Sequence, residues 1–293
     1  MVILNYNTAS YLKQALLSLR DTKDIKMEVI VVDNASKDDS AEMVKKEFSK
    51  EVRLIESDTN LGFAGGNNLA IPYLKGRYVL FLNSDTVTPG DTLGYLVKYM
   101  DENPEVGIVT CRVDLKIGGI DKDCHRGFPT PWAAVTNLVG LSKMFPNSRI
   151  FNQYHKDYLD LKTTHEIDAV TGAFLFVRKS AADKLGYWDE TFFFYGEDLD
   201  FCYRYHEAGW KIVYNPKVHI IHYKGVSSGI KKESQEFSSA QLTTKRRIAR
   251  ESVRAMRIFY NKHYVKKYPW VLNQAIFGVL KVLEWKRVNK YRS

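Results

Sequence analysis

Cysteine is scarce in this chain and does not occur in a pattern typical of a cross-linked or zinc-binding protein. The three cysteines, Cys111, Cys124 and Cys202, are odd in number and lack C-x-x-C spacing. This excludes a disulfide framework or a cysteine-based zinc site as the organising feature of the fold. We therefore expect the protein to work in a reducing compartment, that is, in the cytoplasm.

Long apolar runs are also missing. The longest late run, Ala275 to Leu283, is interrupted by Lys281 and is far shorter than the ~20 residues that a membrane-spanning helix needs. At the other end, Met1 leads directly into the strand-like Val2–Leu4, so we expect no secretory signal. The sequence thus predicts a protein that is not integral to a membrane.

Two common phosphate-binding motifs are absent. The glycine-rich stretch 62–66 does not have the G-x-G-x-x-G spacing of dinucleotide-binding folds, and no G-x-x-x-x-G-K-[ST] motif occurs. A nucleotide site in this chain must therefore differ from those of the Rossmann dehydrogenases and the P-loop proteins.

Charge is unevenly distributed along the 293 residues, whose formal net charge is +9. Residues 243–293 contain 14 Lys+Arg against 2 Asp+Glu, whereas residues 1–242 contain 29 against 32. The body is therefore mildly acidic and the tail strongly basic. This asymmetry favours a tail that binds an anionic surface, either lipid or nucleic acid.

Strand-like and helix-like segments alternate along the first part of the chain. The apolar runs Val2–Leu4, Met27–Val32 and Tyr78–Leu82 are separated by amphipathic segments. Such alternation predicts an α/β fold with a mostly parallel central sheet flanked by helices. Asp33 and Asp85 lie just beyond two of these strands, so both should open onto the crevice at the carboxyl edge of the sheet.

The first helix is expected to begin after Thr8, whose hydroxyl is a suitable N-cap. Its apolar positions Leu12, Ala15, Leu16 and Leu19 fall on one face. This face should pack against the sheet.

Asp85 follows the apolar run Tyr78–Leu82 and the polar pair Asn83-Ser84. A carboxylate at this edge most simply holds a divalent cation, and such a cation commonly accompanies a phosphate substrate. The alternative is that Asp85 only begins a turn that Pro89 and Gly90 complete. This stretch alone leaves both interpretations open.

Three acids, Glu197, Asp198 and Asp200, occupy the first turn of a predicted helix directly after the aromatic run Phe192–Tyr195. Acids stabilise helix N-termini electrostatically, so capping is the simpler alternative. A carboxylate beside apolar rings is partly desolvated, which raises its proton affinity and suits a general base. Because three acids exceed what capping requires, we favour catalysis.

His222 follows the predicted strand Val218–Ile221. A neutral imidazole is a suitable ligand for Mn²⁺ or a similar ion. The alternative is a structural histidine, either in the core or beside His219 on the surface.

Residues 114–165 break the alternation with glycine pairs, prolines and scattered aromatic residues. A long, partly irregular excursion in a compact domain is usually a functional lid or a binding loop.

Seven short motifs occur together in a fixed order. They are Asn5-Tyr6-Asn7, Val31-Val32-Asp33-Asn34-Ala35-Ser36, Asn60-Leu61-Gly62-Phe63-Ala64-Gly65-Gly66-Asn67-Asn68, Leu82-Asn83-Ser84-Asp85, Thr171-Gly172-Ala173, Phe193-Phe194-Tyr195-Gly196-Glu197-Asp198-Leu199-Asp200, and His222. In this order they resemble the family 2 glycosyltransferases with the GT-A fold, particularly the bacterial rhamnosyltransferase-like branch. The resemblance runs from Val2 to about Ser228.

The resemblance implies an inverting transfer of a sugar from a nucleotide-diphospho-sugar to a hydroxyl group. The donor site would be formed by Asn5, Asn7, Asp33, Asn34, Asn60, Gly65, Asn67, Asn83 and Asp85. Asn5 and Asp33 would lie against the base and ribose. On the acceptor side the candidates are Thr171, Gly172, His125 and Arg126, the last two within an insertion at 118–165.

The resemblance also implies the catalytic groups. Asp85 and His222 would bind a divalent cation, Mn²⁺ or Mg²⁺, that bridges the diphosphate and offsets its growing charge. Asp198 would take the proton of the acceptor hydroxyl, with Glu197 orienting it or sharing that work.

The chain departs from the family pattern in three places. Asn83 replaces the first aspartate of the D-x-D motif, Ser84 stands where proline is frequent, and the strand at Val2 lacks the residues that usually precede it. With a single carboxylate at this motif, His222 and the diphosphate itself become more important for holding the cation.

The tail, residues 231–293 after a catalytic domain at 1–230, contains an amphipathic basic helix. Ala249, Val253, Met256 and Tyr260 recur at spacings of 4, 3 and 4, with arginines flanking them. One interpretation is docking on the anionic inner face of the cell membrane. The other is a helix that packs on the domain with a solvated outer face.

We therefore expect a glycosyltransferase acting on a cell-surface glycan or a lipid-linked acceptor, with rhamnose from dTDP-rhamnose favoured. Galactofuranose, glucose or N-acetylglucosamine from a UDP-sugar are the alternative donors. A nucleic-acid-binding module is disfavoured because the basic residues avoid the body and no known DNA- or RNA-binding motif occurs. A nucleotidyltransferase or sugar-nucleotide hydrolase on a similar sheet is a third possibility.

Overall fold

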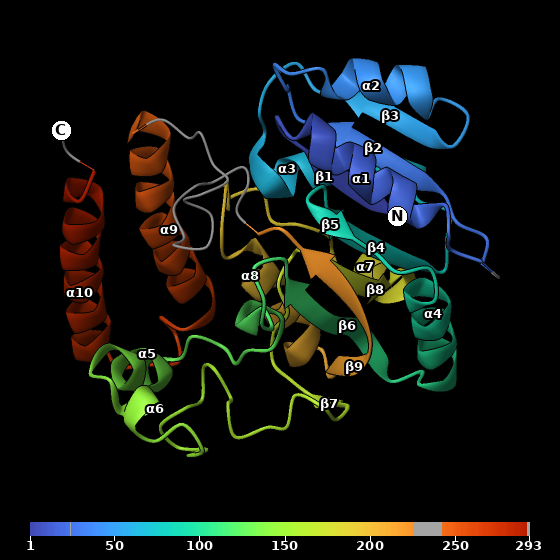
Figure 1. The fold of residues 1–293 in the computed structure, drawn as a ribbon. Helices are drawn as coiled ribbons and strands as arrows, with labels where there is room; N and C mark the ends of the chain where they lie inside the picture. The colour runs from blue at the N-terminus through green and yellow to red at the C-terminus, as the bar shows by residue number, and fades with distance from the viewer. Residues whose placement is uncertain (24, 225–241, 292–293) are drawn as a thin grey trace.

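A mixed sheet, nine-stranded in the part of the chain that the structure describes, forms the centre of the molecule, with helices on both of its faces (Figure 1). The structure is a computed structural model that describes residues 1–23, 25–224 and 242–291. The strand order is β3-β2-β1-β4-β8-β6-β9-β5, and β7 pairs with β9.

The first half of the sheet is parallel, as the alternation predicts. It comprises β1 (Val2–Asn5), β2 (Val29–Asp33), β3 (Val52–Glu56) and β4 (Tyr78–Asn83), connected through α1 (Ala9–Leu19), α2 (Ser40–Glu47), α3 (Gly62–Asn68) and the short 3₁₀ helix η1 (Ile71–Tyr73). Strand β2 is buried along its whole length because helices cover both sheet faces. On α1 the buried positions are the four expected from the sequence.

The register of these strands decides which polar residues meet at the carboxyl edge. Asn5 is paired with Asp33, and Leu4 with Asn83. The motif residues at the ends of β1, β2 and β4 are therefore neighbours. The register thus brings these strand ends together at one edge of the sheet, as expected for a parallel arrangement.

The second half of the sheet is mixed. Its elements are β5 (Thr86–Val87), α4 (Thr92–Glu102), β6 (Val106–Leu115), β8 (Phe174–Arg178), α7 (Lys179–Leu185), α8 (Glu197–Glu207) and β9 (Lys211–His222). Strand β8 runs antiparallel to both β4 and β6, whereas β9 is parallel to β6. The two short strands expected within 211–221 form one long strand, with a register shift opposite Cys111 and Arg112 that accommodates the interruption at Pro216.

The excursion between β6 and β8 is partly irregular, as expected. It contains the 3₁₀ helix η2 (Lys122–Cys124), the short helices α5 (Pro131–Leu138) and α6 (Leu141–Met144), and strand β7 (His165–Glu166). The strand expected from Ala169 begins only at Phe174, so Thr171 and Gly172 lie in the loop that enters β8.

The tail forms two helices, α9 (Leu242–His263) and α10 (Trp270–Asn289), which stand side by side at one end of the molecule (Figure 1). Val253 and Phe259 of α9 are buried, as is Tyr264 directly after the helix, and Phe259 and Tyr264 pack edge-on against Tyr203 of α8. Of the predicted stripe, Ala249, Val253 and Tyr260 are buried, but Met256 is 41% exposed. Its assignment to the stripe was wrong.

The described part of α9 therefore packs on the domain, which is the second of the two interpretations. Helix α10 is held against it by the Tyr260 hydroxyl, which donates a 2.6 Å hydrogen bond to Asn273, and by an edge-on contact of Tyr260 with Phe277. In the regions described, no helix is long and apolar enough to cross a membrane. The domain boundary expected at residues 230 and 231, and the limit of the resemblance near Ser228, lie outside the described residues.

Candidate functional site

The ends of β1 and β2 form one polar cluster. The Asn5 amide donates to Asp33 Oδ1 at 2.9 Å and to Ser36 Oγ at 3.1 Å, and the Ser36 backbone N–H donates to Asp33 Oδ2 at 3.0 Å. Asn5 and Asp33 are both buried. The Asp33 carboxylate is therefore held in one orientation by its neighbours, as a rigid binding group requires.

Thr8 connects this cluster to the motif at the end of β4. Its hydroxyl does not cap α1, contrary to expectation. It donates instead to Asn5 Oδ1 at 2.6 Å and lies 2.8 Å from the Ser84 hydroxyl. Ser84, at the position where the family often has proline, thus contributes a hydrogen bond that proline could not make.

The glycine-rich turn is built by amide side chains. Asn34 donates to Asn60 Oδ1 at 3.2 Å and to the Gly62 carbonyl at 3.0 Å, and it accepts from the Leu61 N–H at 2.9 Å. Asn67, 1% exposed, donates to the Phe63 carbonyl at 2.9 Å within α3. The structure therefore uses these predicted donor-site amides to shape the loop.

Glycine is required at two points of this turn. Gly62 has φ = +76°, and a Cβ there would lie 2.3 Å from the Phe193 carbonyl oxygen, which accepts a 2.9 Å hydrogen bond from the Phe63 N–H. At Gly66 a Cβ would lie 2.5 Å from Leu4 Cδ1. Close packing thus joins the turn to β1 and to the aromatic run before α8. Gly65 lies between these points on α3.

Asp85 and His222 meet as predicted. Thr86 of β5 pairs with His222 of β9, which brings Asp85 Oδ1 to 3.2 Å from His222 Nε2. Two donors bound to one small cation at ~2.1 Å and roughly at right angles lie about 3.0 Å apart. Asn83 Nδ2 lies 3.5 Å from the same nitrogen. The separation of Asp85 and His222 is that of an ion pair between a carboxylate and an imidazolium, and it also matches two ligands of one divalent cation.

Asp121 was not predicted. Its Oδ2 lies 3.5 Å from His222 Nδ1, and its other oxygen is paired with Lys224. Ligand histidines commonly direct their second ring nitrogen at a carboxylate in this way. Burial lowers the pKa of His222, but Asp85 and Asp121 outweigh this effect and raise the pKa to about 9, so His222 must release a proton before it can bind a cation. The signal in the sequence was only an acid within the irregular excursion.

The described residues contain no group of three or more histidine, cysteine or acidic side chains that could hold a metal ion. Asp85 and His222 would thus be two protein ligands, with the remaining positions left to substrate oxygens and water.

A strained turn sets the start of α8. Tyr195 has φ = +70° and Gly196 has φ = +82°, immediately before the acids. Asn7 and Ala35, at φ = +54° and +63°, lie within two other motifs. Positive φ is costly for residues other than glycine and concentrates at functional sites.

The Asp198 carboxylate accepts three hydrogen bonds. Its Oδ2 accepts a 2.5 Å hydrogen bond from Arg126 and a 3.3 Å bond from the Gly172 N–H, while Oδ1 accepts from the Leu199 N–H at 2.7 Å. Arg126, 9% exposed, also donates to the Val170 carbonyl at 3.2 Å. The insertion and the loop before β8 therefore converge on this carboxylate.

Glu197 is buried beside it, and its Oε2 has no hydrogen-bond partner in the described residues. Burial, together with the charge of Asp198, raises the pKa of Glu197 to about 8. Glu197 is therefore protonated at neutral pH, whereas Asp198 faces a guanidinium. The two adjacent acids are thus differentiated by their surroundings, because Asp198 is paired with Arg126 and Glu197 Oε2 has no partner among the described residues, which suits different roles.

Asp200 is fully buried and serves the structure. It accepts from Arg204 at 2.9 Å and from His263 at 2.7 Å, and Lys262 Nζ lies 2.8 Å away. Burial raises its pKa, but the hydrogen bonds from His263 and Lys262 and the charge of Arg204 lower it to about 2. Two of these partners belong to α9, so the tail completes the charge balance of α8.

The expected acceptor-side residues divide into two groups. Arg126 and Gly172 contact Asp198, and the Thr171 hydroxyl lies beside them, accepting from the Ala173 N–H at 3.4 Å. His125 instead contacts His165 and Tyr214. The backbone of Arg126 pairs with that of Ala169 in an isolated antiparallel bridge. Because neighbouring side chains of an extended segment point to opposite sides, His125 and Arg126 have different surroundings. Asn7 is exposed and accepts from the Lys37 N–H at 2.6 Å.

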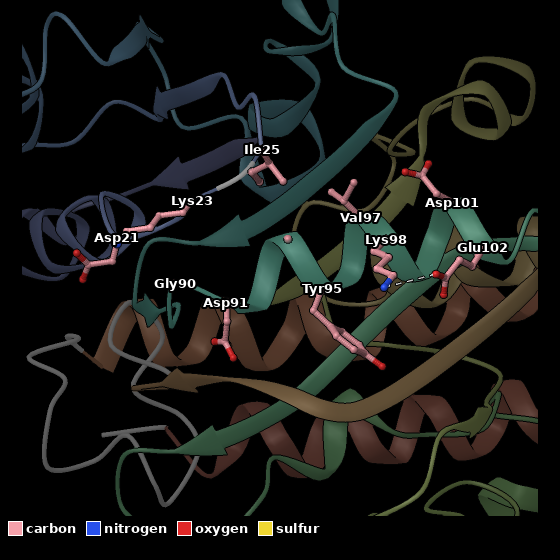
Figure 2. A pocket seen from close by; sticks show the side chains of 11 residues that line it. Asp21, Lys23, Ile25, Gly90, Asp91, Tyr95, Val97, Lys98, Asp101 and Glu102 are labelled. Carbon is pink, nitrogen blue, oxygen red and sulfur yellow. Dashed lines mark ion pairs between the residues drawn. The ribbon is translucent and has the colours of Figure 1, made fainter.

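A hollow of about 750 Å³ lies elsewhere, between α4 and the loop after α1 (Figure 2). Asp21, Lys23, Tyr95 and the Lys98–Glu102 ion pair line it. None of the residues lining this hollow belongs to the motifs described above.

Comparison with known proteins shows which family the chain resembles in sequence. The family model described as "Glycosyl transferase family 2" matches residues 1–186. Rhamnosyltransferase WbbL of Escherichia coli is 26% identical over 234 residues, which cover 76% of this chain and 82% of the relative. N-acetylglucosaminyl-diphospho-decaprenol L-rhamnosyltransferase of Mycobacterium tuberculosis is 25% identical over 240 residues, 78% and 77% of the two chains.

A solved structure shows the fold. The mannosyltransferase of Pyrobaculum calidifontis, in complex with GDP-Man and Mn²⁺, superposes with a TM-score of 0.54 at 18% identity. The match covers 87% of this chain and 62% of the mannosyltransferase. The fold is accordingly the GT-A fold, as expected from the sequence motifs.

The protonation of Glu197 predicts a pH-dependent stability. A carboxyl whose pKa is near 4.3 in the unfolded chain and about 8 in the fold stabilises fully below pH ~4.3, and this contribution is lost as the pH rises through 8. Between pH 5 and 8 the free energy of unfolding of the wild type should therefore fall by about 3 kcal/mol relative to Glu197→Gln.

Chemical denaturation of both proteins across this pH range measures the difference. Glu42→Gln, at an exposed acid of α2, is the control and should follow the wild type. Parallel curves for the wild type and Glu197→Gln would show that Glu197 is ionised in the fold.

Proposed function

Because the chain belongs to glycosyl transferase family 2, we propose that it moves a sugar from a nucleotide-diphospho-sugar to an acceptor hydroxyl with inversion at the anomeric carbon. The observation that carries this proposal is the Asp198 carboxylate, fixed by Arg126 and the Gly172 N–H at the start of α8. A charged acid with a defined orientation is what a general base requires.

The proposed reaction is a single displacement. The acceptor oxygen attacks the anomeric carbon while the bond from that carbon to the diphosphate oxygen breaks, and Asp198 takes the hydroxyl proton. Arg126 and Gly172 keep the carboxylate oriented, and the neutral Glu197 can donate a hydrogen bond to the acceptor or to Asp198. The strained Tyr195–Gly196 turn maintains these positions.

Asp85 and His222 are the proposed ligands of a divalent cation, Mn²⁺ or Mg²⁺. When bound, such an ion offsets the negative charge that develops on the leaving diphosphate. Asp121 would orient His222 through the second ring nitrogen. Asn5 and Asp33, which form one hydrogen-bonded cluster, would bind the base and ribose of the donor.

Rhamnose is the favoured sugar and dTDP-rhamnose the favoured donor, supported by the names of the two relatives at 25–26% identity. A UDP-sugar that carries galactofuranose, glucose or N-acetylglucosamine is the alternative. The name of the mycobacterial relative includes a lipid diphosphate acceptor. We propose a lipid-linked or cell-surface glycan acceptor for this chain as well, with the enzyme on the cytoplasmic side of the membrane.

Replacing the proposed base tests the mechanism. Asp198→Asn should lower kcat by about 10²–10⁴-fold because the amide cannot accept the hydroxyl proton, while donor binding stays within a few-fold of the wild type. Turnover with donor and acceptor, together with donor titration by calorimetry, provides both readouts.

Asp183→Asn, at an exposed acid of α7, is the control and should retain activity. Normal turnover in Asp198→Asn would refute the assigned base. Sugar release at the same rate without an acceptor would favour a hydrolase.

Removing the proposed metal ligand tests the cation. In the wild type, dTDP- or UDP-sugar with Mn²⁺ should raise the melting temperature by about 5 °C near saturation, and a chelator should abolish most of the rise. Asp85→Ala should show little metal-dependent rise, because one of two protein ligands is lost.

Asp91→Ala, in the hollow of Figure 2, should behave as the wild type. A donor-induced shift that is the same with Mn²⁺ and with chelator would count against the cation.

A further inference from the structure

Exposed large hydrophobic side chains are concentrated in two segments. Among the described residues, 14 of the 19 such side chains lie within 132–150 or 256–285. Large exposed apolar patches usually mark interaction sites. The rest of the surface shows only scattered apolar residues, which need no explanation.

Helix α10 has two apolar faces. Its inner face, with Asn273, Leu280 and Val288 buried, lies against α9. Its outer face carries apolar or small residues at spacings of 4, 3, 4 and 3, which places them in one stripe: Val271, Ala275, Gly278, Val282 and Trp285. Val271 is 71% exposed, Val282 54% and Trp285 66%. A surface helix needs only one apolar face for the core, so this outer stripe is left for a partner.

The charges around the outer stripe are almost all positive. Lys281 and Lys286 of α10, and Lys290 just after it, are exposed. The single acid of α10, Glu284, is 3.6 Å from Arg257. The stripe is thus an apolar band flanked by cations, with tryptophans Trp270 and Trp285 near its two ends.

The second exposed segment belongs to the insertion. Leu138 of α5, Val139 directly after it and Met144 of α6 are 63–65% exposed. In the view of Figure 1, α5 and α6 lie near the end of the α9–α10 pair at which α10 begins. The same insertion supplies Arg126, which contacts Asp198. The exposed apolar side chains therefore lie in the insertion and in the tail. These are also the two segments whose side chains contact the first turn of α8.

We propose that the outer stripe of α10, with its flanking lysines, docks parallel to the surface of an anionic lipid bilayer. Apolar residues can enter the headgroup boundary, tryptophans prefer that depth, and lysines reach anionic headgroups while their stems cover apolar surface. The stripe of α9 that the sequence suggested for this role is largely buried, so the structure moves the docking face to α10.

A second copy of the chain is a poorer occupant of this face. A symmetric contact through α10 would bring the lysines of both copies together, and like charges across an interface oppose association. An anionic bilayer offers the complementary charge, at about 1 kcal/mol for each lysine, which corresponds to about fivefold in binding. The proposed docking does not depend on the sugar donor or on the role of Asp198.

Vesicle flotation of the full chain tests the proposal, with phosphatidylcholine vesicles that either contain or lack phosphatidylglycerol. The wild type should bind the anionic vesicles at least about tenfold better than the neutral ones. Val282→Glu/Trp285→Glu should weaken binding to anionic vesicles about tenfold or more, because it places charge in the apolar stripe. Lys281→Glu/Lys286→Glu should largely remove the preference for anionic lipid.

Two matched controls use exposed residues of helices in the first half of the chain. Leu17→Glu on α1 and Lys46→Glu on α2 should bind vesicles as the wild type does. All variants change exposed positions, so their melting temperatures should stay close to that of the wild type.

Undiminished binding by Val282→Glu/Trp285→Glu would overturn the proposal. It would also be overturned by sedimentation equilibrium showing a wild-type dimer that this double variant dissociates, combined with no vesicle binding. That result would assign the stripe to a second copy of the chain.

Discussion

The first turn of α8 buries three acids within four residues, and much of the surrounding structure compensates their charge. Buried carboxylates are costly unless they are paired, hydrogen-bonded or protonated. Each of the three meets this constraint differently: Asp198 pairs with Arg126, Asp200 pairs with Arg204, Lys262 and His263, and Glu197 keeps its proton. The cations come from three separate parts of the chain. The constraint therefore fixes where the insertion and the tail must lie.

This arrangement gives the tail a structural role in the domain that precedes it. Lys262 and His263 hold Asp200 on the same helical turn as Asp198, so α9 supports the position of the proposed base. A truncation that removes the tail would leave Asp200 buried with fewer partners and would confuse loss of membrane binding with loss of the site. Helix α10 has its outer stripe free for a bilayer because α9 already provides the attachment to the domain.

Local patterns in the sequence predict much of the fold and many positions of the site. Asp33 and Asp85 follow apolar strands, and Asp198 follows an aromatic run at a helix start; these signals span only a few residues, and the register brings the strand ends together as expected. The partners were missed where contact depends on distant segments. Lys224 reaches Asp121 across 103 positions, and His263 reaches Asp200 across 63. Met256 was misassigned because α9 has neighbours on two sides, and periodicity alone does not say which side is buried.

Asp198 is both a buried acid that is paired with Arg126 and the proposed general base. A double-mutant cycle with Arg126→Met, Asp198→Asn and the double variant measures the coupling between the two residues in the free energy of unfolding. If the buried carboxylate depends on this guanidinium, each single variant leaves an unpaired polar or charged group, and the coupling should be about 2–3 kcal/mol. Additive effects, with a coupling within about 0.5 kcal/mol of zero, would contradict the dependence of Asp198 on the insertion.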